Sequence, residues 1–192
     1  GQKATCILGK MSDSYLSSKA WGHGLATIAS DGSVLDVWYP SPEVGEAPKS
    51  DLQWFSPRDL DSMVGKDELR NVHTEVLRVE ISLDQPVEST QDAYLRLHLL
   101  SHLLVAPNTI NLEGLIPNLP IVAFTNRGVM ALADYESKLI GLRSAGVVAH
   151  SIDKFPRLID YVVPKKVRIA DANRVRLGAH LAPGTTVMPV SY

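Results

Sequence analysis

The chain has 192 residues, 45% of them apolar and 21% charged, and its formal net charge is −2. This composition is typical of a globular protein, and the lack of a basic excess argues against nucleic-acid and acidic membrane partners. No apolar run approaches the ~18 residues of a membrane-spanning helix, and the N-terminus lacks the apolar core of a signal peptide. The single cysteine, Cys6, excludes an internal disulfide, so we expect a reducing, cytoplasmic location.

The N-terminal part of the chain predicts a lead-in followed by a β-hairpin. Residues 1–20 are polar and rich in serine and lysine, so we interpret them as a mobile lead-in. Two β-favouring runs, residues 24–28 and 34–39, flank Asp31-Gly32, which is a strong hairpin signal. A short helix and a strand are expected next, over residues 57–64 and 72–83.

The middle of the chain predicts one buried helix and then a mixed unit. The helix begins at Ser89, with Asp92 in a capping-box-like position, and runs to about residue 105. Its leucines cover most of its circumference, as they do in buried helices. A strand, a turn, an amphipathic helix and a second strand then follow, over residues 120–125, 126–128, 131–145 and 147–152. This succession has βαβ character, so residues 21–152 are interpreted as an α+β or α/β domain.

The last part of the chain, residues 167–192, has a period of six. The aliphatic residues that recur at this spacing are Ile169, Val175, Leu181 and Val187, and mostly small or polar residues lie between them. Six is neither the period of a helix nor that of a flat strand. It is the period of a hexapeptide β-helix, in which one aliphatic residue per hexad points inward.

Four phrases of the sequence resemble the tetrahydrodipicolinate N-succinyltransferases, in the branch with a long N-terminal domain. They read GLATIASDGSVLDVWYPSPE, DAYLRLHLLSHLLVAPNTINLEGL, SIDKFPRLIDYVVP and VRIADANRVRLGAHLAPGTTVM, at residues 24–43, 92–115, 151–164 and 167–188. The resemblance implies an α+β N-terminal domain followed by the first coil of a left-handed parallel β-helix. Residues 153–166 would then be a linker, and residues 167–192 the start of a truncated β-helix.

The same resemblance implies a biosynthetic acyltransferase. The family moves a succinyl group from succinyl-CoA to tetrahydrodipicolinate, in the diaminopimelate route to lysine, and it works as a homotrimer on small-molecule substrates. The family's catalytic glutamate would fall beyond Tyr192, so no catalytic residue is assigned and the 192 residues alone are expected to be inactive. Two alternatives remain: a hexapeptide acyltransferase with another acyl donor, and a non-catalytic trimerisation or interaction module.

The candidate ligand contacts are basic residues near the linker and one amide. Lys154 and Arg157, next to Asp160, suit a dicarboxylate or a phosphate-rich donor; alternatively they pin the linker to the β-helix. Family members usually place a magnesium-holding aspartate at the position of Asn173, and a second acid where Pro189-Val190-Ser191 stands. Because hard cations prefer carboxylate oxygen, this departure argues against magnesium here.

Other polar residues are interpreted as structural. His98 and His102 share one helical face and could hold a metal, but no third ligand is visible nearby. Arg96, on the same helix, is expected to be a salt-bridge partner. Three arginines should point away from a β-helix interior, as inter-subunit salt bridges or as a solvated face: Arg168, Arg174 and Arg176.

Overall fold

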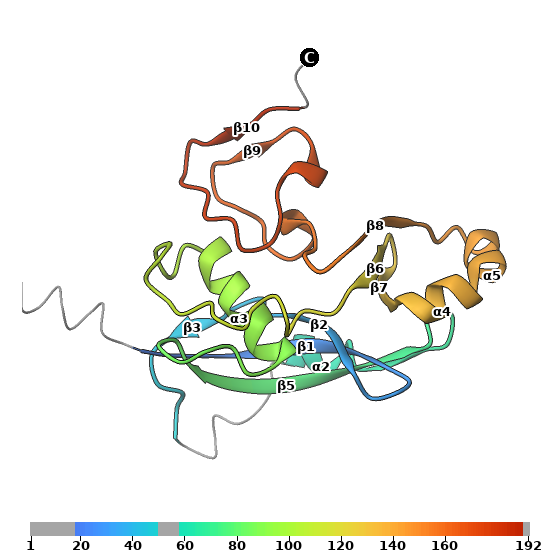
Figure 1. Cartoon of the computed structure of the whole chain (residues 1–192), viewed down its shortest axis with the longest axis horizontal. Helices are drawn as coiled ribbons and strands as arrows, with labels where there is room; N and C mark the ends of the chain where they lie inside the picture. Colours follow the sequence, from blue (N-terminus) through green and yellow to red (C-terminus); the bar gives the residue numbers. More distant parts are fainter. Residues whose placement is uncertain (1–17, 50–57, 190–192) are drawn as a thin grey trace, which may run out of the picture.

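The computed structural model describes residues 18–49 and 58–189. The expectations for Cys6, Pro57 and residues 190–191 lie outside this range. Along the chain come an antiparallel sheet, a buried helix, a second antiparallel sheet and a C-terminal pair of parallel strands (Figure 1). None of the helices within those two ranges is long and apolar enough to cross a membrane.

The first sheet is built around the predicted hairpin. Its strands, in the order β2-β1-β5-β4 with β3 also on β1, are β1 (Lys19–Ala29), β2 (Val34–Trp38), β3 (Glu43–Val44), β4 (Gly65–Asp67) and β5 (Val72–Ser82). In the turn, Asp31 Oδ1 accepts hydrogen bonds from the amide and hydroxyl of Ser33, and Gly32 has φ +86°. The hairpin, the short helix α2 (Arg58–Asp61) and the long strand are therefore confirmed, and β1 already includes Lys19 and Ala20 of the expected lead-in.

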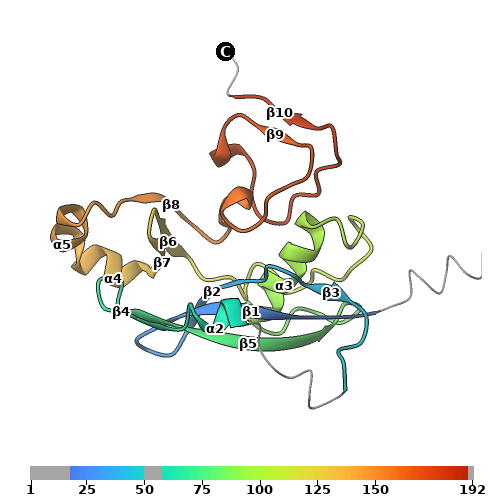
Figure 2. The ribbon, with the colours of Figure 1, turned by 180° about the vertical axis from the view of Figure 1, so that it is seen from behind.

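Helix α3 (Thr90–Ser101) begins at the predicted cap, since the Ser89 hydroxyl accepts from the Asp92 amide at 3.1 Å. Every residue from Asp92 to Ser101 is buried, as predicted from the apolar circumference. The helix ends four residues earlier than expected because Leu103 adopts a left-handed φ of 61°. One side of α3 lies on the first sheet and the other lies beneath the C-terminal strands (Figures 1 and 2).

The predicted βαβ unit is wrong. Strands β6 (Val122–Thr125) and β8 (Ala149–Asp153) are antiparallel, because β6 first turns tightly into β7 (Gly128–Ala131). The expected single helix is also wrong: it divides into α4 (Leu132–Ser137) and α5 (Leu139–Ser144). The break at Lys138 accompanies burial of Leu142 in a small core with Ala123, Met130 and Val147. With both sheets antiparallel, this part of the chain is α+β rather than α/β.

The C-terminal strands pair across three hexads. Strand β10 (Thr186–Val187) runs parallel to β9 (Arg168–Ile169), and Val187 pairs with Ile169, the hexad residue three units earlier. Two 3₁₀ turns, η2 (Leu158–Asp160) and η3 (Ala172–Arg174), lie before and between these strands. The four hexad aliphatics all pack in or against the main core, with Val175 fully inside it.

This C-terminal segment rests directly on α3. The Ser101 hydroxyl accepts from the Gly178 amide at 2.8 Å and donates to the Ala179 carbonyl at 3.0 Å. Gly178 has φ +105°, and a side chain there would collide with Leu97. Helix α3 therefore packs against the first sheet on one side and against the hexad segment on the other, and all three share the main core.

Candidate functional site

Of the two predicted histidines, His98 lies within α3 and has a structural role. His102 follows the last residue of the helix, and its Nε2 is buried with no hydrogen-bond partner in the described part of the chain. His98 is fully buried; its Nδ1 lies 2.7 Å from the Tyr94 carbonyl, and its Nε2 accepts from the Tyr39 amide at 3.2 Å. Burial lowers the pKa of His98 to about 3, so the ring is neutral. Both ring nitrogens are thus occupied, and neither is left for a metal.

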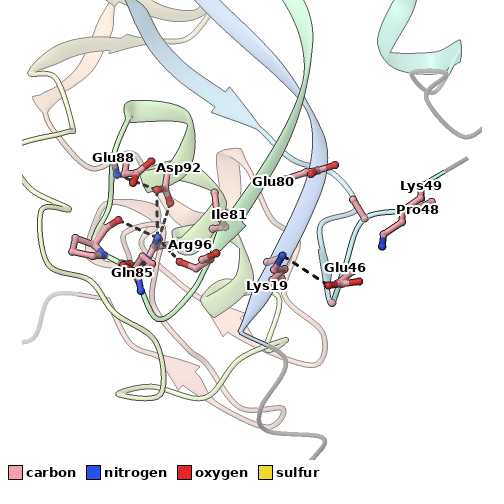
Figure 3. A pocket seen from close by; sticks show the side chains of 15 residues that line it. Lys19, Glu46, Pro48, Lys49, Glu80, Ile81, Gln85, Glu88, Asp92 and Arg96 are labelled. Atoms are coloured by element: carbon pink, nitrogen blue, oxygen red, sulfur yellow. Dashed lines mark hydrogen bonds and ion pairs between the residues drawn. The ribbon is translucent and has the colours of Figure 1, made fainter. Parts of the chain in front are cut away.

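Arg96 is saturated by its own chain. Its guanidinium bonds both Asp92 oxygens, at 2.7 and 3.3 Å, and the backbone carbonyls of residues 82, 85, 86 and 111. Arg96 and Asp92 lie along the wall of an open pocket of about 640 Å³, where Figure 3 shows Arg96 directed at Asp92 and Gln85. Since a guanidinium has five N–H donors, none remains for a ligand, and the predicted salt-bridge role is confirmed.

Lys154 and Arg157 lie in different surroundings. The Lys154 ammonium donates to the Ile116 and Leu119 carbonyls, both at 2.8 Å, and so fixes the loop before β6. Arg157 forms a two-point ion pair with Asp160, at 2.9 and 3.2 Å. His150 Nε2, from β8, lies 3.4 Å from the same carboxylate. Lys154 thus acts as a brace in this structure, whereas Arg157 belongs to a cluster of charged groups.

That cluster lines a cleft between the two sheets and the linker. We call it the junction cleft; its volume is about 360 Å³. Strands β1 and β2 form one wall, β6 and β7 a second, and the η2 segment closes it. Its apolar lining is Leu25, Trp38, Phe124 and Val129, and its ionisable lining is Asp36, His150, Arg157, Asp160 and Tyr161. Thr27, Thr125 and Asn126 also line the cleft, so polar side chains outnumber apolar ones there. Such a lining suits a small polar molecule.

Asp36 is the most deeply buried charged group of this cleft. It is only 8% exposed, and its Oδ2 accepts from the Tyr161 hydroxyl at 2.5 Å. Burial raises the pKa of Asp36, while the Tyr161 hydroxyl, the neighbouring Thr27 and the charge of Arg70 oppose that rise. Burial and the nearby Asp36 charge raise the pKa of Tyr161 well above 10, so Tyr161 remains the donor. The indole of Trp38 donates to the Tyr161 carbonyl at 2.9 Å, which ties β2 to the linker a second time.

The polar residues of the hexad segment bond mostly within the chain. Arg174 donates to the Met188 and Pro189 carbonyls, and Arg176 to the Phe155 carbonyl. Asn173 is exposed, and its backbone N–H donates to Asp171 Oδ1 at 3.0 Å. A neutral amide does not fit magnesium well. Within residues 18–49 and 58–189, no three histidine, cysteine or acidic side chains gather closely enough to hold a metal.

The comparisons with known proteins agree with the resemblance read from the sequence. No protein-family model matches the chain. A 2,3,4,5-tetrahydropyridine-2,6-dicarboxylate N-succinyltransferase of Salinispora tropica is 46% identical over 180 residues, which are 88% of this chain and 55% of that protein. An enzyme of the same name from Pseudomonas aeruginosa is 52% identical over 107 residues, which are 55% of this chain and 31% of that protein. The resemblance to the N-succinyltransferases is confirmed.

The chain spans about half the length of the Salinispora relative and a smaller share of the Pseudomonas one. A solved structure from Campylobacter jejuni, described as a 2,3,4,5-tetrahydropyridine-2-carboxylate N-succinyltransferase, matches with a TM-score of 0.68. That match covers 98% of this chain and 62% of the other at 19% identity, so it bears on the fold alone.

Proposed function

We propose that the protein containing this chain transfers a succinyl group from succinyl-CoA to tetrahydrodipicolinate, in the diaminopimelate route to lysine. The observation that carries this proposal is the 46% identity with the Salinispora succinyltransferase, which extends over 88% of the chain. Similarity over 88% of the chain is far more than one short motif would give. We also propose that the protein works in the cytoplasm; the single cysteine supports a reducing compartment.

Residues 167–192 would be the first coil of a left-handed parallel β-helix, following a linker at 153–166 and an N-terminal domain at 21–152. Support comes from the parallel pair β9–β10, whose partners lie three hexads apart, as they do after one turn of a three-sided coil. The hexad aliphatics also point into the core. Coils of this kind bury their interior by stacking on neighbours.

The chemistry is acyl transfer between two small molecules. The amine of the ring-opened acceptor attacks the thioester carbonyl, a C–N bond forms, and the C–S bond breaks. Coenzyme A then leaves as a thiol, while the amine loses its proton to a carboxylate base. We propose a homotrimer in which the acyl donor lies between neighbouring β-helices. Of the two predicted substrate contacts, Arg157 is the better placed, because it lines a cleft while Lys154 is bound to two carbonyls.

A coupled thiol assay tests this proposal on the protein expressed from its own gene. Free coenzyme A is followed with a thiol reagent in the presence of succinyl-CoA, with and without tetrahydrodipicolinate. The proposal predicts thiol release that requires the acceptor. Release that is equally fast with acetyl-CoA would favour a hexapeptide acyltransferase with another donor. No acceptor-dependent release from a folded protein would contradict the enzyme proposal.

The alternative from another class is a non-catalytic trimerisation or interaction module. It is favoured by the compact core that joins the hexad segment to α3, which requires no ligand. Light scattering tests this alternative. An interaction module should form an oligomer whose mass does not change with protein concentration and which has no transferase activity, whereas an inert protein should remain a monomer.

A further inference from the structure

The second sheet has a pocket on the face that the proposed function does not use. Strand β6 presents Phe124 to the core shared with the first sheet, and Ala123 to the small core that includes Leu142 of α5. The junction cleft lies on the Phe124 side. A separate pocket of about 180 Å³, which we call the α5 pocket, is lined by α4, α5 and the residues that lead into β8. Both views of the molecule show these two helices at one end, away from β9 and β10 (Figures 1 and 2).

Most of the lining of the α5 pocket is apolar. The apolar lining residues are Leu139, Leu142, Val147 and Val148. Leu142 and Val147 are buried in the small core, whereas Leu139 and Val148 are about half exposed, so the pocket can be reached from solvent. Its volume is about six times the ~30 Å³ that one water occupies in the liquid, so it has room for a ligand of only a few heavy atoms.

Two polar groups of this pocket have hydrogen-bond donors to spare. Arg143 is exposed, and its guanidinium makes no hydrogen bond or ion pair within the described part of the chain, unlike Arg157 with its Asp160 partner. The Tyr135 hydroxyl accepts a long hydrogen bond of 3.4 Å from the Ala149 amide, and its own O–H has no acceptor among residues 18–49 and 58–189. None of the described residues that line the pocket is acidic. The pocket therefore offers a cation and a hydroxyl donor without an anion.

A carboxylate with a short aliphatic chain fits this combination of groups. A guanidinium binds a carboxylate through charge-assisted hydrogen bonds, and a tyrosine hydroxyl can donate to the same anion. The aliphatic chain would cover the apolar lining and remove it from water. An alkylammonium would instead be repelled by Arg143, and a purely apolar ligand would leave both donors unused.

We propose that the α5 pocket binds a small aliphatic monocarboxylate, with its chain against Leu142 and Val147 and its carboxylate on Arg143 and the Tyr135 hydroxyl. The site lies on the opposite face of the second sheet from Arg157, so it is distinct from the proposed substrate contact. It is also away from the strands of the hexad segment, so its occupant takes no part in acyl transfer between β-helices.

The test uses sodium pentanoate as the probe and the methyl resonances of Leu142 and Val147 as the readout, on the protein expressed from its own gene. At neutral pH pentanoate is ionised. We expect a saturable shift of both sets of methyl resonances and none of the Leu177 methyls, which lie in the main core. Pentan-1-ol and pentylammonium should each bind about tenfold more weakly than pentanoate.

Variants identify the groups that hold the carboxylate. Arg143→Gln should bind pentanoate about tenfold more weakly, and Tyr135→Phe about three- to tenfold more weakly. Arg168→Gln is the matched control, because it removes another exposed guanidinium, on β9, and should leave pentanoate binding unchanged.

Three results would overturn the proposal. If pentan-1-ol binds the unmodified protein as tightly as pentanoate, the pocket is an apolar cavity and the charge plays no part; this comparison needs no variant to fold. If Arg143→Gln binds pentanoate as tightly as the unmodified protein, the guanidinium does not hold the carboxylate. If pentanoate gives no saturable shift, the pocket takes no ligand of this class. None of these outcomes depends on transferase activity.

Discussion

Replacing Arg96 with methionine should destabilise the fold far more than replacing Arg157, whose ion pair is partly exposed. The guanidinium is 1% exposed and contacts Asp92, itself 7% exposed at the side chain, and four backbone carbonyls. Methionine fills similar space but leaves the buried Asp92 carboxylate without a cation and with only the Glu88 backbone N–H as a donor, which costs about 3–5 kcal/mol. Because the free energy of unfolding of a typical protein is about 5–15 kcal/mol, this loss would remove a large part of the stability of the fold.

Urea unfolding followed by far-UV circular dichroism measures this loss. The Asp92→Asn, Arg96→Met double variant removes the unpaired charge, so its loss should be smaller than the sum of the two single losses by about 0.5–3 kcal/mol. Arg157→Met is the matched control, because that ion pair is partly exposed and should contribute about 1 kcal/mol or less. A loss below about 1 kcal/mol for Arg96→Met, or strictly additive losses, would refute the reasoning.

Three further perturbations follow from the same core. In the folded protein the pKa of His98 is lowered to about 3, whereas in the unfolded chain it is near 6.5. The unfolded chain therefore binds a proton that the folded protein does not, and the free energy of unfolding should fall as the pH drops from about 6.5 to 3. His98→Gln should show a shallower decline, by up to about 1.4 kcal/mol per pH unit, in urea titrations at several pH values. Gly24→Ala should cost about 1–3 kcal/mol by thermal unfolding, because the new Cβ meets Val37 and Tyr39; an unchanged midpoint would contradict that packing. Leu177→Ala should cost about 2–5 kcal/mol and lower the urea midpoint, unless the hexad segment does not pack into the main core.

Local signals in the sequence predicted the local structure well. The Asp31-Gly32 turn, the Ser89 cap and the apolar circumference of α3 each depend on neighbouring residues, and each is present. The direction in which β8 pairs with β6 has no such signal. A helical stretch between two strands is compatible with either parallel or antiparallel pairing of those strands. The short strand β7 determines the antiparallel arrangement, and it overlaps the ends of the expected turn and helix, so the sequence has no separate signal for it.

The junction cleft could not be predicted from the sequence for the same reason. Asp36 and Tyr161 are 125 positions apart, and neither belongs to a recognisable motif. Arg157 and Asp160 were found because they lie in a short linker that resembles the family. No motif marks Trp38 either, although its indole donates to the linker and its side chain lines the cleft.

The most direct test of the central claim is to follow the acyl group itself. Isotope-labelled succinyl-CoA is incubated with tetrahydrodipicolinate and the protein expressed from its own gene, and the products are analysed by mass spectrometry. The account predicts that the label appears on the amine nitrogen of the acceptor, and only when protein and acceptor are both present. A folded protein that leaves all the label on coenzyme A, or releases it as free succinate, would contradict the account.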